Sequence, residues 1–205
     1  MPEKHAMNVG LNAFLKLAAL DMSQQMAEVA KRIASDASGY DYYRTLRSAI
    51  KAFIDDKGID KINSILASAP TLAEREYNTQ AYQRFVEKFG KSRKRLSLFQ
   101  GAATLSLARK RLKVSVRPTF MLETKNGVEV YHVWAIQKPE LKRHLGAMGC
   151  FICNEAFRNT QYSNYEFKLF DTVGNRISAK PANASSTLSE KTGLDILHWA
   201  EIAST

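Results

Sequence analysis

The spacing of the hydrophobic residues changes partway along the chain, and this change limits which folds the sequence can adopt. Up to about residue 89, apolar side chains recur every three or four positions, which is the period of an amphipathic helix. From about residue 114 they alternate with polar residues, which is the period of a half-buried strand. A chain that keeps helices and antiparallel strands in separate stretches is predicted to form an α+β fold.

The first half of the chain is predicted to be helical. The apolar pattern assigns five helices, at residues 9–18, 22–33, 43–56, 59–67 and 72–89. Thr71-Leu72-Ala73-Glu74 matches a capping box, in which a hydroxyl and a carboxylate bind free amides at a helix start. Gly90 is a natural stop for the fifth helix.

The second half is predicted to begin with a β-hairpin. Asn126-Gly127 lies between two alternating segments, 114–122 and 128–136, and this dipeptide tolerates the positive φ angles of a tight turn. Pro118 cannot donate a hydrogen bond to a neighbouring strand, so the first strand is expected to be an edge or to carry a bulge there.

The hairpin is followed by a predicted helix, two short strands and a last helix. Pro139 suits the first turn of a helix, because its missing N–H needs no partner there. Strands are expected at 165–169 and 176–180, and the polar stretch 181–189 is expected to be a linker. A second capping pattern, Thr192-Gly193-Leu194-Asp195, is predicted to start the last helix.

The predicted architecture is therefore a helical cluster followed by a β-hairpin–helix–β-hairpin unit and a C-terminal helix. We divide it into a helical subdomain at 1–90, a basic connector at 91–112 and a ββαββ-α subdomain at 113–205. The last subdomain is expected to share one core with residues 1–90. The length of 205 residues fits one domain or two small ones.

The cysteine content favours a reducing compartment. The two cysteines, Cys150 and Cys153, are too few for a disulfide scaffold. On a helix they share one face, but a structural zinc site needs four ligands and the chain has no second pair. We therefore expect buried, inert thiols and no cofactor. No stretch reaches the roughly 20 apolar residues of a membrane span, so we expect a cytoplasmic protein.

The excess positive charge is confined to one segment. Between Arg84 and Arg117 the sequence has eleven basic residues and one acid, Glu87, and this window carries the whole formal net charge of +10. A charge concentrated in this way attracts polyanions. On a strand, Lys113 and Arg117 would lie on one face and the valines between them on the other.

The first functional hypothesis is that the protein binds nucleic acid, DNA or RNA, through phosphates and with little sequence preference. We call residues 84–117 the basic window; its first half is 84–95 and its second half is 109–117. The hypothesis requires both halves to lie on one side of the molecule. The residues predicted to contact phosphates are Lys91, Arg93, Lys94, Arg95, Arg109, Lys110, Arg111, Lys113 and Arg117. A solvated connector that keeps the chain soluble accounts for the same charge run equally well. The second hypothesis is a protein-interaction or regulatory subunit whose basic segment docks an acidic protein partner.

A metal-dependent nuclease is the third hypothesis. Glu166-Phe167-Lys168 has the acid-x-lysine form of such enzymes, and Asp171 is close in sequence. Strand parity places Asp171 on the opposite face from Glu166 and Lys168, which argues against the group. Glu123 or Glu129 on the hairpin could replace Asp171 only if the strands were adjacent. His132 lies on an apolar strand face and is expected to be a hydrogen-bonded core residue, not a base.

Overall fold

The computed structural model describes residues 7–34 and 41–204, which form helices and two mixed sheets and confirm the α+β class. The helices are α1 (Leu11–Ala19), α2 (Met22–Ala34), α3 (Arg44–Ile54), α4 (Ile59–Ala67), α5 (Leu72–Phe89), the 3₁₀ helix η1 (Gly90–Arg95), α6 (Arg143–Phe157) and α7 (Ser185–Ala203). The strands are β1 (Met7–Gly10), β2 (Leu96–Leu98), β3 (Ala103–Leu107), β4 (Leu112–Val116), β5 (Phe120–Thr124), β6 (Gly127–Trp134), β7 (Glu166–Asp171) and β8 (Arg176–Ser178).

The larger sheet lies between two hydrophobic cores. Its order is β2-β5-β6-β7-β8, with β6 and β7 parallel and joined through α6. Because side chains alternate along a strand, Tyr131 and Val133 of β6 pack with α3, α4 and α5, whereas Val130 and Trp134 pack with α1, α6 and α7. Each core combines segments from the first 90 residues with later ones.

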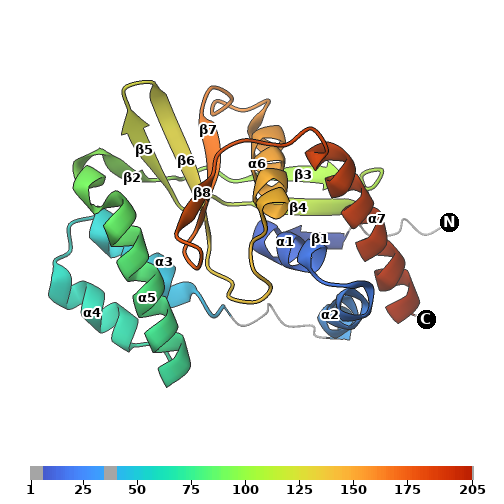
Figure 1. The fold of residues 1–205 in the computed structure, drawn as a ribbon, viewed down its shortest axis with the longest axis horizontal. Helices are drawn as coiled ribbons and strands as arrows, with labels where there is room; N and C mark the ends of the chain where they lie inside the picture. Colours follow the sequence, from blue (N-terminus) through green and yellow to red (C-terminus); the bar gives the residue numbers. More distant parts are fainter. Residues whose placement is uncertain (1–6, 35–40, 205) are drawn as a thin grey trace.

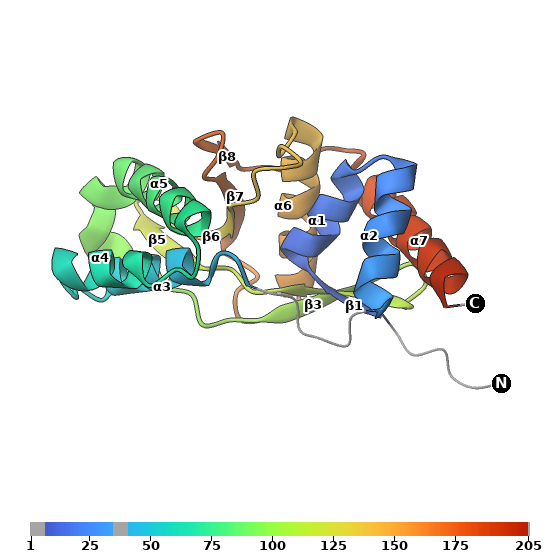
Figure 2. The same cartoon turned by 90° about the horizontal axis from the view of Figure 1, so that it is seen from below.

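The smaller sheet lies beside the larger one and has the order β1-β4-β3. β1 runs parallel to β4, and β3 runs antiparallel to it. The segment that joins β2 to β3 crosses from the larger sheet to the smaller one along the long axis of the molecule (Figure 1). Helices α1, α2, α6 and α7 lie on one side of the smaller sheet, and no described helix lies on its other side (Figure 2).

Several local predictions are confirmed. The Thr71 hydroxyl caps α5 by accepting a hydrogen bond of 3.2 Å from the backbone amide of Glu74. β5 and β6 form the predicted hairpin, in which Thr124 pairs with Gly127 and Gly127 adopts a φ of 133°. A side chain at that φ would be strained, which explains why the turn uses glycine.

The strand predicted over 114–122 is in fact two strands. Val114 and Val116 belong to β4 in the smaller sheet, whereas Phe120 and Leu122 belong to β5 in the larger one. Pro118 is buried at the point where the chain leaves one sheet for the other. Its missing N–H marks a change of sheet and not only an edge or a bulge.

The prediction that Pro139 opens a helix is wrong. The guanidinium of Arg176 donates to the carbonyl of Leu141 and lies 3.2 Å from the carboxylate of Glu140, which holds this stretch as a loop. Helix α6 therefore begins at Arg143.

The polar linker predicted at 181–189 is also wrong in its second half, because α7 already begins at Ser185. The hydroxyl of Ser189 is buried and donates to the carbonyl of Ser185 at 2.7 Å, so small polar residues form this turn. Thr192-Gly193-Leu194-Asp195 therefore lies inside α7, where Gly193 packs against the β3–β4 turn.

Three strands, β1, β2 and β3, were not predicted from the sequence. The last two residues of β1, Val9 and Gly10, were expected to belong to the first helix, and β2 and β3 lie in the segment 91–112 that was interpreted as a connector. These strands span only three to five residues, so any alternation within them is too short to distinguish a strand from a loop. None of the helices in the described chain is long and apolar enough to span a membrane.

Candidate nucleic-acid interface

The two halves of the basic window lie at opposite ends of the molecule. The first follows α5 through η1 into β2, at the end where α4 and α5 lie (Figures 1 and 2). The second includes the β3–β4 turn, which lies at the other end beside α7 (Figures 1 and 2). The expectation that both halves share one surface is therefore wrong, because the segment between them, 96–108, forms strands in two different sheets.

At the first end, the arginines contact other parts of the chain. Arg93 forms an ion pair with Asp56, donates to the carbonyl of Phe53 at 3.0 Å and places its guanidinium 4.9 Å from the centre of the Phe53 ring. Arg95 donates to the hydroxyl of Ser92 at 2.8 Å. Lys91 and Lys94 are exposed. Arg93 thus anchors η1 to α3, and only part of this cluster is open to a partner.

At the second end, the cations surround the β3–β4 turn. Ala108, Arg109 and Lys110 adopt φ values of 49°, 57° and 66°, a left-handed run that reverses the chain between the two strands. Arg109 and Lys110 are exposed at its tip. Arg111 is also exposed but forms an ion pair with Glu201 of α7.

The outer face of the smaller sheet is polar and extends from this turn. Lys113 is exposed on the centre strand β4, and Leu112, Val114 and Val116 face the core, as parity predicts. Arg117 is exposed just after β4 ends. The same face carries hydroxyl and amide side chains from all three strands: Asn8, Thr104, Ser106 and Ser115.

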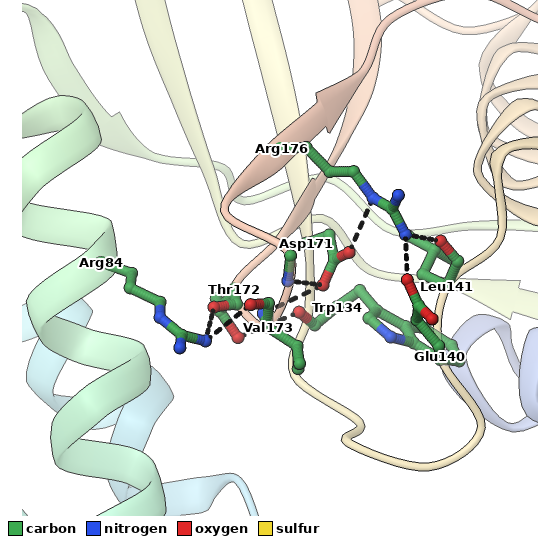
Figure 3. Close-up of polar contacts among 9 residues, drawn as sticks. Arg84, Trp134, Glu140, Leu141, Asp171, Thr172, Val173 and Arg176 are labelled. Atoms are coloured by element: carbon green, nitrogen blue, oxygen red, sulfur yellow. Dashed lines mark hydrogen bonds and ion pairs between the residues drawn. The ribbon is translucent and has the colours of Figure 1, made fainter.

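Arg84, the first residue of the basic window, has a structural role. Figure 3 shows its guanidinium reaching from α5 to the carbonyls of Thr172 and Val173, at 2.6 and 2.8 Å. The neighbouring carboxylate of Asp171 is buried and accepts from the amide of Val173 and from Arg176, at 3.0 and 3.1 Å (Figure 3). These contacts hold α5 against the β7–β8 turn, so Arg84 is not open to a ligand.

Beyond β4, the chain borders a crevice at the junction of the two sheets and α3. We call it the junction crevice; its cavity has a volume of about 430 Å³. Its polar side chains are Asn12, Tyr43, Arg47, Lys51, Arg117, Thr119 and His132. Its apolar walls are Leu46, Leu98, Pro118, Val133 and Ala135. A second cavity of about 450 Å³ adjoins it and shares Asn12, Arg117 and His132.

His132 forms the wall between the two cavities and is only 8% exposed. Its Nε2 lies 2.9 Å from the amide oxygen of Asn12, and the Asn12 amide nitrogen donates to the carbonyl of Val133 at 3.3 Å. Burial lowers the pKa of His132 to about 4; the Arg117 backbone raises it, and the charge of Arg47 lowers it further. The expected hydrogen-bonded core histidine is confirmed, and its ring is neutral at pH 7.

The acid-x-lysine group of the nuclease hypothesis is an ion-pair cluster. β6 and β7 are adjacent, and Glu129 pairs in register with Glu166. The Nζ of Lys168 lies 2.6 Å from Glu129 and 3.3 Å from Glu166, and the hydroxyl of Tyr131 donates to Glu129. Burial acts to raise the pKa of Glu129, but the hydrogen bonds from Lys168 and Tyr131 lower it overall.

This cluster gives no support to metal-dependent cleavage. The ammonium of Lys168 occupies the place between the two carboxylates where a cation would bind. Across residues 7–34 and 41–204, no group of three His, Cys, Asp or Glu side chains is arranged to hold a metal ion. Asp171 points to a different region of the fold, as strand parity predicts.

The cysteines are buried in the middle of α6, as expected. The thiol of Cys150 donates to the carbonyl of Ser178 at 3.0 Å. Burial raises the pKa of Cys150 to about 11 and that of Cys153 well above its usual value. Neither thiol is therefore activated as a nucleophile or as a metal ligand.

The comparisons with known proteins give no family for this chain: no family matches its sequence, and no curated protein is significantly similar to it. The candidate site therefore depends on geometry alone. Sequence reasoning found Lys113 and Arg117 but missed Arg47 and Lys51 of α3. Their four-residue spacing places both on one helix face, yet only the tertiary fold brings that face to Arg117.

Proposed function

We propose that the protein binds nucleic acid through phosphates, with little sequence preference, using β4 and the turn that precedes it. This interface is narrower than the one expected from the sequence, because it leaves out the cations at the opposite end, Lys91, Arg93, Lys94 and Arg95. The observation that supports this most is the outer face of the smaller sheet. Lys113 and Arg117 are exposed there, Arg109 and Lys110 extend the same strand pair, and β1, β3, β4 and the turn contain no acidic residue.

The spacing of these cations suits an extended polyanion. Lys113 and Arg117 are four residues apart, which corresponds to roughly 13 Å along a strand. The exposed hydroxyls of Thr104 and Ser106 on the neighbouring strand add neutral donors for phosphate oxygens. The groups that this face offers are charges and hydroxyls, which contact phosphate oxygens and carry no information about the bases, so binding is expected to depend on charge and not on sequence.

Two acids limit the strength of the interface. Glu201 neutralises Arg111, and the carboxylate of Glu190 accepts the backbone amide of Ala108 at 2.8 Å behind the turn. Four cations, Arg109, Lys110, Lys113 and Arg117, are then the main contacts. Four phosphate contacts predict that the logarithm of affinity falls with the logarithm of salt at a slope of about −4 for duplex and about −3 for single strands.

The test is a salt titration of fluorescence anisotropy with labelled random oligonucleotides, single- and double-stranded, of DNA and RNA. The double substitution Lys110→Gln and Lys113→Gln is expected to reduce the slope by about 2 and the affinity about tenfold or more at low salt. The matched control is Lys91→Gln with Lys94→Gln, which removes the same charge at the opposite end. Equal losses in the two double variants, or no loss in the first, would refute the proposal.

An acidic protein surface would meet the same cations, so the titration includes polyglutamate as a competitor. Nucleic acid is expected to bind more tightly than polyglutamate of equal charge, because the hydroxyls of the sheet face also contact phosphate oxygens. Tighter binding of polyglutamate would instead favour an acidic protein partner and overturn the assignment to nucleic acid.

A further inference from the structure

We propose that the junction crevice binds a terminal phosphate group, carried either by a small phosphomonoester or by the end of a nucleic-acid strand. This cavity is lined by three basic side chains, Arg47, Lys51 and Arg117. Two of them come from α3 and one from the segment after β4. The crevice is a different surface from the outer sheet face and shares only Arg117 with it.

The charge balance of the crevice favours a terminal phosphate over an internal one. Arg47 forms an ion pair with Asp41, so the four charged groups together carry a net charge of about +2. A phosphomonoester carries between about −1.5 and −2 at pH 7, whereas each internal phosphodiester carries −1. The monoester therefore matches the crevice more closely, and it competes with Asp41 for the guanidinium of Arg47.

The three basic side chains of the crevice are exposed, so a ligand in the crevice can reach their charged groups. The Arg47 side chain keeps 46% of its surface exposed beside Asp41. The Asn12–His132 hydrogen bond fixes the wall beside Arg117, and the neutral imidazole adds no charge of its own.

The start of α1 adds a further positive field beside the crevice. Gly10 precedes α1 and offers no side-chain cap, and the first turn of this helix has no acidic residue. Gly10, Leu11 and Asn12 line the adjoining cavity together with Arg117. Free amides at a helix start favour an anion nearby, so they support the charge of the three basic side chains.

The remaining walls fit the body of a nucleotide. The cavity of about 430 Å³ is within the range of small-molecule sites. Half-buried Leu98 offers apolar surface, and half-buried Tyr43 lies at the same crevice. Adenosine monophosphate is therefore a suitable probe, because it joins a terminal phosphate to a planar, weakly polar body.

The first experiment measures binding of adenosine monophosphate, adenosine and inorganic phosphate by calorimetry. The monophosphate is expected to bind most tightly. Lys51 is exposed, so Lys51→Gln leaves the fold intact and is expected to weaken monophosphate binding about tenfold. Lys61→Gln, an equal charge change at an exposed site on α4 outside the crevice, is the matched control and is expected to change nothing.

A second variant is expected to tighten monophosphate binding instead of weakening it. Asp41→Asn removes the carboxylate that competes for Arg47 and is expected to tighten monophosphate binding several-fold. The proposal fails if the monophosphate binds no better than adenosine. It also fails if Lys51→Gln and Lys61→Gln have equal effects, or if Asp41→Asn weakens binding.

A third experiment identifies the source of the phosphate by comparing one oligonucleotide with and without a 5′-phosphate. A gain from the 5′-phosphate that Lys51→Gln abolishes assigns the crevice to strand ends. Binding of the monophosphate without such a gain assigns it to a small phosphomonoester. Lys113→Gln separates this site from the sheet face, because it is expected to weaken the oligonucleotide without 5′-phosphate and leave adenosine monophosphate unaffected.

Discussion

Acid destabilisation through His132 is the prediction that the structure defines most closely. In the unfolded chain this imidazole binds a proton below about pH 6.5, but burial in the folded protein lowers its pKa to about 4. Between these values the unfolded state holds more protons than the folded state. The free energy of unfolding therefore falls as the pH falls from about 6.5 towards 4.

The magnitude follows from the two pKa values. A difference of about 2.5 pKa units corresponds to about 3 kcal/mol when the pH is below both values. Between pH 7 and pH 5 the loss attributable to His132 is about 2 kcal/mol. Since a domain of this kind is stable by roughly 5–15 kcal/mol, a loss of this size is readily measured.

The assay is urea unfolding, followed by tryptophan fluorescence, at several values between pH 4.5 and pH 7.5. Trp134 is fully buried and reports the loss of the core. Carboxylates also titrate in this range, so the informative quantity is the difference between wild type and His132→Gln. This variant keeps a polar side chain beside Asn12 but cannot titrate. The exposed His198 gives the matched control, His198→Gln.

The wild type is expected to lose about 2 kcal/mol more than His132→Gln between pH 7 and pH 5. The reasoning is refuted if the two proteins lose stability in parallel over this range. It is also refuted if His198→Gln removes as much of the pH dependence as His132→Gln.

Three further predictions concern stability and reactivity. Cys150 and Cys153 are expected to react with a thiol reagent at pH 8 only at the rate of unfolding, because burial raises both pKa values; fast labelling of the native protein would contradict this. Gly149→Ala is expected to destabilise α6 by about 1–3 kcal/mol in thermal unfolding, because its Cβ would lie 2.5 Å from Leu169. Thr71→Ala is expected to cost about 1 kcal/mol in the same assay through loss of the α5 cap.

The sequence predicted the elements whose signals are local. The cap at Thr71, the turn at Gly127 and the apolar face of α6 depend on residues within a few positions of one another. The failures involved partners distant in sequence. β1 becomes a strand because it pairs with β4 about 100 residues later, and the loop before α6 depends on contacts from Arg176.

The prediction of one continuous basic surface failed for the same reason, because it too depends on contacts between residues distant in sequence. Its two halves are close in sequence, yet β2 and β3 join different sheets and carry the two halves to opposite ends of the molecule. Strand parity correctly predicted that Lys113 faces away from the core, because parity is a local property. Which cations share a surface is set by sheet pairing, and the local pattern holds no information about it.

In the folded protein, Arg117 belongs to two positive surfaces, the outer face of the smaller sheet and the junction crevice. On one side of this residue, β4 and its turn carry cations on an open sheet face that suits a flexible polyanion. On the other side, Arg47 and Lys51 of α3 line a cavity of about 430 Å³. An open face sets no limit on the length of a ligand, whereas a cavity of this size holds only a small ligand or a chain end. The two proposals together therefore place the backbone of a nucleic-acid strand on the open face and its terminus in the crevice.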